Sequence, residues 1–292
     1  MQTFEQATEE SRRMARLYAL IHRGNPGDVE CYVAACDGAT RVLELGCGEG
    51  RVLEALVTHH PSLEISGLDL DPGALAEACT REPLAQAMEA GRVQLHQADM
   101  RDFELEGSFD RIIIPYNGLY TLGSLDGVRQ CLATAARHLT PDGALIFDGY
   151  AVDDDAADAE LWVDPPDPNE VAEDPWCEGG FSYLITVLDL QQRVDVYERE
   201  IAVGEPRRLN VRYRFVIRSG SPFEPPTGEP EVIEQVVGHH FITPGMVPAL
   251  IRDAGLKLVS MWGEFDGRPF DDESERLVVT ARKTNDTGES SR

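Results

Sequence analysis

Between residues 40 and 150, short apolar segments alternate with longer segments of helical periodicity. We expect strands at 40–45, 63–70, 92–99, 109–116 and 144–150, and helices at 50–60, 71–91 and 125–139, with TPDG as a turn before the last strand. The segment FDRIIIPY is apolar almost throughout, which is typical of a strand buried on both faces. Strands and helices that alternate at this spacing predict a parallel, doubly wound sheet of the α/β class.

After residue 150 this alternation stops. Residues 151–180 hold eleven Asp and Glu residues and no Lys or Arg, which indicates a loop. Four segments between 181 and 241 then alternate apolar and polar residues without helical segments between them, so we expect an antiparallel sheet. A helix at 243–255 and strands at 256–265 and 275–283 resume the first pattern. The predicted fold is a Rossmann-like, doubly wound, seven-stranded sheet with an antiparallel β insertion after strand five.

Charge restricts the partners that the chain can bind. The 292 residues carry a formal net charge of −26, which repels phosphate backbones and anionic membrane surfaces. The six cysteines form no C-x-x-C pair, which fits a reducing compartment. The chain shows neither an apolar leader nor an apolar run long enough to span a membrane. We therefore expect a cytoplasmic protein with no nucleic-acid or membrane partner.

The segment LELGCGEG follows the first strand and places glycine at positions 46, 48 and 50. Glycines allow a main chain to approach a ligand that a Cβ atom would block. A phosphate-binding loop would continue with Lys and Ser or Thr, and this segment does not. Glu44 and Glu49 would also disfavour a pyrophosphate. The loop thus predicts a ligand with little negative charge.

Two further acids end the next two strands. Asp69 ends the second strand, where a carboxylate accepts hydrogen bonds from a ribose diol. Asp99 ends the third strand, where it could accept one from an exocyclic amine. A ligand with a ribose, an adenine and little negative charge is therefore expected. S-adenosyl-L-methionine fits, because it joins a nucleoside to a cationic sulfonium and an amino acid.

The successive segments VLELGCGEGR, ISGLDLDPGAL, VQLHQADMRDF, FDRIIIPYNGLYTL and RHLTPDGALIFD resemble the motifs of class I S-adenosylmethionine-dependent methyltransferases. The closing segment at 254–283 looks like the last helix–strand–strand unit of that family. The resemblance implies five parts, which are an N-terminal helical lid at 1–39, an S-adenosylmethionine-binding core at 40–150, an acidic loop with the insertion at 151–241, the C-terminal part of the core at 242–284 and a disordered tail at 285–292.

The resemblance also implies which residues hold the cofactor. Gly46, Cys47 and Gly48 would shape the loop around the methionine part, and Glu44 would contact its amine. For the nucleoside, the implied contacts are Asp69 on the ribose hydroxyls, Leu70 near the adenine, Asp99 on the adenine amine and Met100 on the ring.

The N-terminal segment LYALIHRGNPGDVECY is similar to the opening of small-molecule N-methyltransferases, where a comparable segment folds over the cofactor. It suggests Tyr18, His22, Arg23 and Tyr32 as lid residues. Arg23 would hold the cofactor carboxylate.

The insertion and strand four bear on the methyl acceptor. Pro115-Tyr116-Asn117-Gly118 differs from the N/D-P-P-Y motif of DNA and protein-glutamine methylases, and Tyr116 would line the methyl-transfer channel. An insertion after strand five resembles glycine/sarcosine and amino-sugar N-methyltransferases, in which it covers a small substrate and often forms a dimer contact. We therefore expect a small-molecule acceptor, most simply an amine, and a homodimer through the insertion.

Three alternatives remain open. An O-methyltransferase of a secondary metabolite would need a general base, and His239 and His240 are the candidates. A catechol-type enzyme would need a metal, and Asn117 and Asp148 match that arrangement only superficially, so no metal is predicted. The chain could also bind S-adenosylmethionine without catalysis. If the chain is an enzyme, the product formed from the cofactor is S-adenosyl-L-homocysteine. The residues expected to orient the acceptor are Tyr116, Tyr120 and Tyr150.

Overall fold

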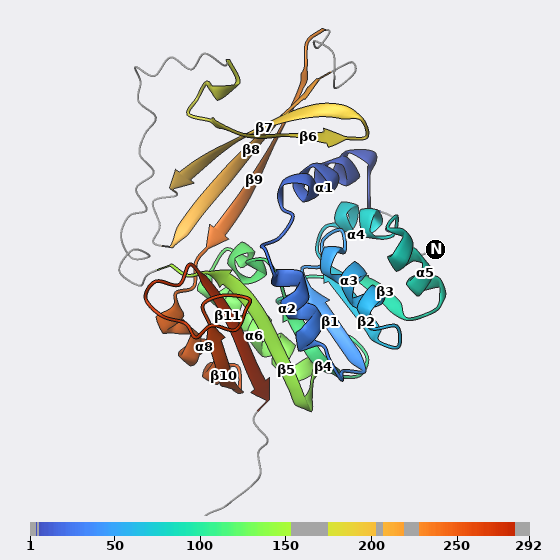
Figure 1. The fold of residues 1–292 in the computed structure, drawn as a ribbon, viewed down its shortest axis with the longest axis vertical. Helices are drawn as coiled ribbons and strands as arrows, with labels where there is room; N and C mark the ends of the chain where they lie inside the picture. Colours follow the sequence, from blue (N-terminus) through green and yellow to red (C-terminus); the bar gives the residue numbers. More distant parts are fainter. Residues whose placement is uncertain (1–3, 5, 153–174, 203–206, 219–227, 284–292) are drawn as a thin grey trace, which may run out of the picture.

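The computed structural model describes residues 4, 6–152, 175–202, 207–218 and 228–283 (Figure 1). Seven strands form one sheet in the order β10-β11-β5-β4-β1-β2-β3. Their bounds are β1 (Arg41–Leu45), β2 (Glu64–Asp69), β3 (Val93–Gln97), β4 (Phe109–Ile114), β5 (Leu139–Tyr150), β10 (Leu256–Trp262) and β11 (Arg276–Lys283). β1 to β5 are parallel, whereas β11 is antiparallel to β5 and to β10. The predicted seven-stranded Rossmann-like sheet is confirmed, with the last two strands making it mixed.

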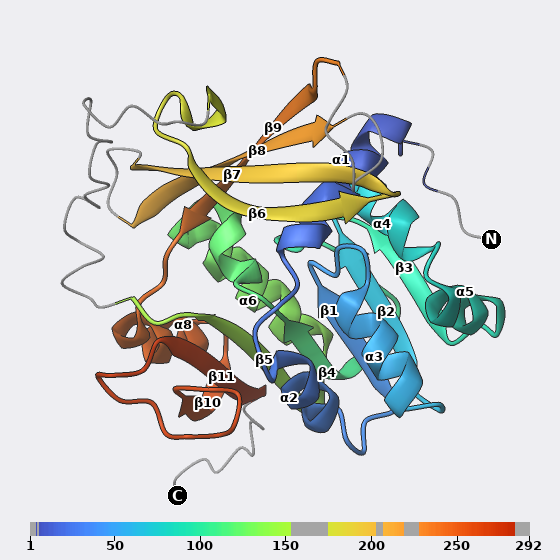
Figure 2. The same ribbon diagram turned by 45° about the horizontal axis from the view of Figure 1, so that its top comes forward.

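Helices cover both faces of this sheet (Figure 2). The described helical elements of the core are α2 (Asp28–Ala35), α3 (Arg51–His59), α4 (Pro72–Ala78), α5 (Glu82–Glu89), η1 (Gly118–Leu122), α6 (Leu125–His138), η3 (Pro244–Met246) and α8 (Val247–Asp253). On β4, Ile113 packs in one hydrophobic core with Leu53 of α3, and Ile112 packs in a second core with Leu132 of α6. Because neighbouring residues of a strand face opposite sides, two covered faces require the continuous apolar run seen in the sequence. No described helix has the length and apolar character needed to cross a membrane.

Two local predictions are wrong. The single helix expected over 71–91 is two helices, with a break at residues 79–81. Pro83 accounts for the break, because it has no N–H to donate to the carbonyl four residues earlier and therefore does not fit inside one long helix. In the first turn of α5 no such hydrogen bond is made, so proline is tolerated there. The TPDG segment lies inside β5, not in a turn before it. Where β5 contains this segment, its pairing with β4 changes register, and the change falls between Phe109 and Arg111 of β4.

A second, antiparallel sheet follows β5 in the chain, as predicted. It contains β6 (Ser182–Asp189), β7 (Gln192–Ala202), β8 (Arg208–Arg218) and β9 (Glu231–His240) in that order, and a short helix η2 (Pro175–Cys177) precedes it. Figure 1 shows this sheet lying over one end of the core. Most of the acidic loop and the predicted disordered tail lie outside the described residues.

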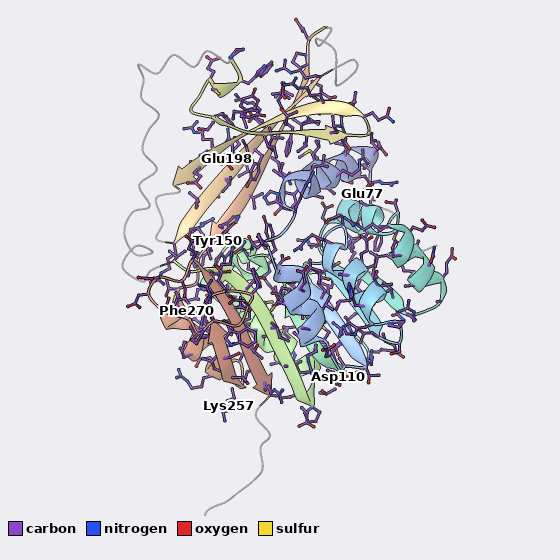
Figure 3. All side chains as sticks on the ribbon, in the orientation of Figure 1. Glu77, Asp110, Tyr150, Glu198, Lys257 and Phe270 are labelled. Atoms are coloured by element: carbon purple, nitrogen blue, oxygen red, sulfur yellow. The ribbon has the colours of Figure 1, made fainter. Side chains whose placement is uncertain are left out.

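Helix α1 (Glu9–Ile21) lies between the insertion and the core (Figure 1). Its Leu17 is fully buried in the hydrophobic cluster of the insertion sheet. On its other side it packs on α4, where a Cβ atom at Gly73 would lie 2.5 Å from the carbonyl carbon of Ser11. Glu77 of α4, labelled in Figure 3, accepts a hydrogen bond from Arg12 Nε at 2.7 Å. One helix therefore joins the insertion to the core.

The variant Gly73→Ala tests this junction. The added methyl group would overlap the backbone of α1, so we expect the free energy of unfolding to fall by about 1–3 kcal/mol, although alanine is the better helix former. Urea unfolding followed by circular dichroism measures the change. An unchanged midpoint would contradict the close packing of α1 on α4.

Candidate active site

A cavity of about 330 Å³ lies beside the glycine loop, at the carboxyl ends of the first four strands. The structure brings most of the predicted cofactor residues together in its lining, namely Tyr18, Glu44, Gly46, Cys47, Gly48, Asp69, Leu70, Asp99 and Met100, and with them Tyr116, the predicted residue of the methyl-transfer channel. These residues are far apart in the sequence and meet because parallel strands end at the same edge of a sheet. That edge is where open α/β sheets bind their ligands.

The glycine loop is shaped for close approach by a ligand. Gly46 and Gly48 have φ angles of 73° and 54°, in the left-handed region that other residues rarely adopt. A Cβ atom built on either meets no atom within 4 Å, so the loop borders open space. The backbone N–H of Gly48 donates to Asp69 Oδ2 at 2.7 Å, which fixes the loop to the end of β2. Gly50 differs, since its Cβ would lie 2.5 Å from Leu84, and it therefore serves packing.

Glu44 is the buried acid among those that line this cavity. Glu44 is 3% exposed, and its Oε2 has no hydrogen-bond partner among the described residues. Burial raises the pKa of Glu44 well above its usual range, and burial likewise raises the pKa of Asp69. A buried carboxyl oxygen without a donor is costly unless a ligand supplies one. A cationic or amine-bearing ligand would satisfy Glu44, and a phosphate would not.

Asp99 lines the same cavity but is already engaged. Arg101 Nε donates to Asp99 Oδ2 at 2.9 Å, and this interaction lowers the pKa of Asp99. Each carboxylate oxygen can accept a second hydrogen bond, so the predicted contact with an adenine amine stays a prediction. Arg101 also lines the cavity and was not singled out from the sequence.

The N-terminal segment is placed only partly as predicted. The rings of Tyr18 and His22 stack with centroids 3.7 Å apart, and both residues line the cavity. Burial lowers the pKa of His22 to about 4, so the ring is neutral at pH 7. Arg23 is exposed and lies outside the described lining, with its Nε donating to Leu20 O at 2.9 Å. Tyr32 is buried beneath the site in α2.

Arg51, the first residue of α3, is an arginine that sequence reasoning missed. It lines the cavity, is hydrogen bonded to both carboxylate oxygens of Asp28 at 3.0 and 2.8 Å, and lies 5.8 Å from the centre of the Tyr116 ring. An arginine that opens an amphipathic helix usually points into solvent, so the local pattern gave no signal. Its partner Asp28 holds the loop before α2 against the site.

A second cavity of about 440 Å³ lies between the core and the insertion sheet. It shares Tyr18, His22, Tyr116 and Thr121 with the first cavity. Its lining also includes Asn117, Tyr150, Glu198, Glu200, Tyr213 and His239. Figure 3 labels Glu198 on the insertion sheet and Tyr150 at the end of β5. The two cavities are therefore neighbours with a common wall.

The structure separates the two predicted histidine bases. His239 lines the second cavity, and burial lowers its pKa, so that it is neutral at pH 7. His240 is not among the described lining residues. Because consecutive residues of β9 face opposite sides of the sheet, only one of the pair can point toward the core. The outcome for a catalytic role of either histidine stays open.

The turn after β4 is held in an uncommon conformation. Tyr116 and Asn117 have φ angles of 56° and 59°. The buried carboxylate of Asp148 accepts hydrogen bonds from Tyr116 N at 2.8 Å and from Tyr32 Oη at 2.6 Å. Such a turn persists only where its surroundings fix it, and it often marks a functional site. Tyr120, which we expected to orient the acceptor, is buried and donates to Tyr150 O at 2.6 Å.

Comparison with known proteins assigns the domain. Residues 42–143 match a family model described as a methyltransferase domain. This part of the chain is a methyltransferase domain. The chain as a whole resembles class I S-adenosylmethionine-dependent methyltransferases, and amino-sugar N-methyltransferases among them. The family and the fold support S-adenosylmethionine as the cofactor, and the glycine loop with the unsatisfied Glu44 oxygen fits it.

Individual relatives match part of this chain at low identity. A dTDP-3-amino-3,6-dideoxy-alpha-D-glucopyranose N,N-dimethyltransferase from Streptomyces fradiae is 29% identical over 148 residues, which cover 48% of this chain and 54% of the relative. A malonyl-[acyl-carrier protein] O-methyltransferase from Bacillus cereus is 34% identical over 110 residues, 38% of this chain and 37% of the relative. The chain thus spans about half the length of these curated relatives or less.

Solved structures extend the likeness to the whole fold. The S-adenosylmethionine-bound structure of an amino pentose methyltransferase from Micromonospora echinaspora, involved in calicheamicin biosynthesis, has a TM-score of 0.62 at 22% identity. The match covers 92% of this chain and 96% of that one, so the insertion is included in the shared architecture.

The variant Asp69→Ala tests the nucleoside site. It removes both the predicted ribose contact and the hydrogen bond from Gly48, so affinity for S-adenosylhomocysteine should fall by about tenfold or more. Asp71→Ala is the matched control, because Asp71 lies two residues away and caps α4 through Gly73 N at 2.7 Å. Calorimetry should show the control within about twofold of the wild type. Equal losses in both variants would contradict the assignment.

Asp148 should give the methyltransferase domain a specific pH dependence. Burial raises the pKa of Asp148 to about 6 from 3.8, so the folded state holds this proton more tightly than the unfolded state. The resulting stabilisation is complete below about pH 4 and is lost as the pH rises through 6. Relative to Asp148→Asn, the wild type should lose about 2–3 kcal/mol of unfolding free energy between pH 4 and pH 7. Paired urea titrations measure this, and a constant difference would contradict the buried, charged carboxylate.

Proposed function

We propose that this chain transfers a methyl group from S-adenosylmethionine to the nitrogen of a small amine. The observation that carries the proposal is the common wall of the two cavities, formed by Tyr18, His22, Tyr116 and Thr121. A donor bound at the glycine loop and an acceptor bound under the insertion would meet at this wall. Holding two reactants next to each other in the right orientation supplies much of the rate of such a transfer.

The first cavity, which we call the donor cavity, would hold the cofactor through residues that are already held in place by hydrogen bonds within the protein. The glycine loop would surround the methionine part, Glu44 would accept from its amine, and Asp69 would accept from the ribose hydroxyls. The cofactor, when bound, supplies a methyl group activated by a cationic sulfur. Asp148 holds Tyr116 in place from below, so the common wall need not rearrange for the reaction.

The second cavity, which we call the acceptor cavity, would hold a small substrate. The insertion sheet and α1 both supply walls of this cavity, whose volume of about 440 Å³ suits a small molecule. A neutral amine can attack a methyl group through its lone pair without a strong base, and the methylated nitrogen loses a proton afterwards. The amino-sugar substrates named for the similar enzymes support nitrogen as the acceptor atom.

O-methylation is the second candidate function. It is favoured by His239, which lines the acceptor cavity and is neutral at pH 7, so that it could take the proton of a hydroxyl group. The O-methyltransferase relative keeps this candidate open. A third candidate, binding of S-adenosylmethionine without turnover, predicts cofactor affinity with no acceptor-dependent release of S-adenosylhomocysteine.

His239→Ala separates the two catalytic candidates, with His240→Ala as its matched control. If nitrogen is the acceptor, both variants should keep activity within about fivefold of the wild type. If a hydroxyl group is the acceptor, loss of the base should lower kcat about 10²–10⁴-fold in His239→Ala alone. Release of S-adenosylhomocysteine with panels of amines and phenols measures both, and the second pattern would overturn N-methylation.

A homodimer through the insertion also stays a proposal. Leu188 of β6 and Val232 and Val236 of β9 are large apolar residues of the insertion sheet that are at least two-fifths exposed in the single chain. They lie on the two edge strands of the sheet, where exposed apolar side chains and unpaired strand edges favour association with another chain. Sedimentation equilibrium at micromolar concentration gives the oligomeric state directly, and a monomer would refute the proposal.

A further inference from the structure

The described lining of the acceptor cavity contains negatively charged side chains but no lysine or arginine, and this restricts the class of substrate that it can bind. Its two carboxylates are those of Glu198 and Glu200. We infer that the acceptor is an amine that binds as a cation and carries no phosphate group, that Glu198 and Glu200 recognise it, and that one of these carboxylates takes its proton before the neutral nitrogen attacks. The inference rests on the proposed function, because it assumes that this cavity receives the methyl acceptor.

The two acids are placed by the alternation of β7. Val194 and Val196 are buried in the cluster that packs around Leu17 of α1. Glu198 and Glu200 follow at the same two-residue spacing, so they continue the face that is turned toward the core. That face is apolar where α1 covers it and becomes acidic where the cavity begins. A plain sheet–helix contact would continue with apolar residues, so the change of character coincides with the site.

No described group in the lining balances these charges. His22 and His239 both have lowered pKa values because of burial, and they are neutral at pH 7. Two arginines interact with lining tyrosines, namely Arg51 with Tyr116 and Arg276 with Tyr150, but each is paired with a carboxylate. Arg51 is bound to Asp28, and Arg276 lies 3.4 Å from Glu264.

The segments outside the described residues cannot supply the missing charge, with one exception. By sequence, residues 1–3, 5, 153–174, 203–206 and 219–227 contain no lysine or arginine, and residues 284–292 contain only Arg292. By sequence, residues 153–174 are themselves strongly acidic.

A second observation points to a hydrogen-bonding ligand in the same cavity. Asn117 lines it and is 3% exposed, and its Oδ1 has no hydrogen-bond partner among the described residues. A buried amide oxygen of this kind requires an N–H or O–H donor. Tyr18, Tyr116, Tyr150 and Tyr213 add aromatic surface, which attracts ammonium groups. Carboxylates, aromatic rings and a free acceptor atom together suit an ammonium ion with hydrogen-bond donors.

The inferred substrate differs from that named for one relative. The Streptomyces fradiae enzyme acts, by its name, on a sugar linked to dTDP, which carries a diphosphate. Protein sites that hold diphosphates use Arg, Lys or helix N-termini, and two carboxylates would repel one. The acceptor of this chain is therefore an amine such as an unphosphorylated amino sugar, not a nucleotide-linked one.

The test compares two probes that differ only in the nucleotide. The full-length protein is saturated with S-adenosylhomocysteine, and calorimetry measures the binding of 3-amino-3-deoxyglucose and of its dTDP conjugate. The proteins are the wild type, Glu198→Gln, Glu200→Gln and the double variant. Glu234→Gln is the matched control, because Glu234 belongs to the same sheet, pairs with Arg214 and is not among the described lining residues.

In the wild type the free amino sugar should bind at least about tenfold more tightly than the conjugate. The double variant should lose about tenfold or more in affinity for the free sugar and gain affinity for the conjugate. Affinity for S-adenosylhomocysteine should stay within about twofold in every variant. Glu234→Gln should match the wild type with both probes.

The inference would be overturned if the wild type bound the conjugate more tightly than the free sugar, or if it did not bind the free sugar. Unchanged affinities for both probes in the double variant would also overturn it. With S-adenosylhomocysteine still bound, any of these leaves the proposed methyl transfer standing. Failure of S-adenosylhomocysteine to bind would instead remove the proposed function, and this inference with it.

Discussion

The packing of α1 between two sheets is the contact on which the rest of the architecture depends. Leu17 packs with the insertion sheet, and Gly73 lets the backbone of the same helix lie directly on α4. Tyr18 and His22 lie at the C-terminal end of this helix, in the wall that the two cavities share. If α1 separated from either layer, the cavities would lose this wall together with the closure above it.

The site combines a rigid donor side with an acceptor side whose walls come from distant parts of the chain. On the donor side, short hydrogen bonds tie the glycine loop to β2 and tie the turn at Tyr116 to Asp148. On the acceptor side, α1, η1, β5 and all four strands of the insertion each contribute residues. Similar structures share the donor fold, whereas in the proposed function the side chains around the second cavity select the acceptor. This explains why the comparisons support the cofactor and leave the acceptor to be proposed.

The sequence could predict which residues meet at the first cavity because the signals for them are local. Glu44, the glycines and Asp69 each stand at the end of a readable strand, and the order of strands brings them together. Arg23 was expected at the carboxylate of the cofactor, yet the structure places Arg51 in the cavity lining. Which of the two arginines reaches the cavity depends on the path of the loop before α2, and the periodicity of the sequence does not predict the path of a loop.

The acceptor side was predicted poorly because its geometry is non-local. Glu198 and Glu200 look like ordinary solvent-facing residues of an alternating strand until the sheet is placed over the core. The pair His239-His240 offered two bases, and only the face of β9 distinguishes them. From the sequence, Asp148 matched a metal-ligand arrangement only superficially, and its burial and its hydrogen bonds from Tyr32 and Tyr116 give it a supporting role.

The most direct test of the account is the position of the transferred methyl group. The protein is incubated with S-adenosylmethionine carrying a ¹³C-labelled methyl group and with a panel of phosphate-free amines that also bear hydroxyl groups. The product is then examined by NMR and mass spectrometry. The account predicts that the label appears on nitrogen, together with an equal amount of S-adenosylhomocysteine. Label on oxygen, or release of S-adenosylhomocysteine that does not depend on any amine, would contradict it.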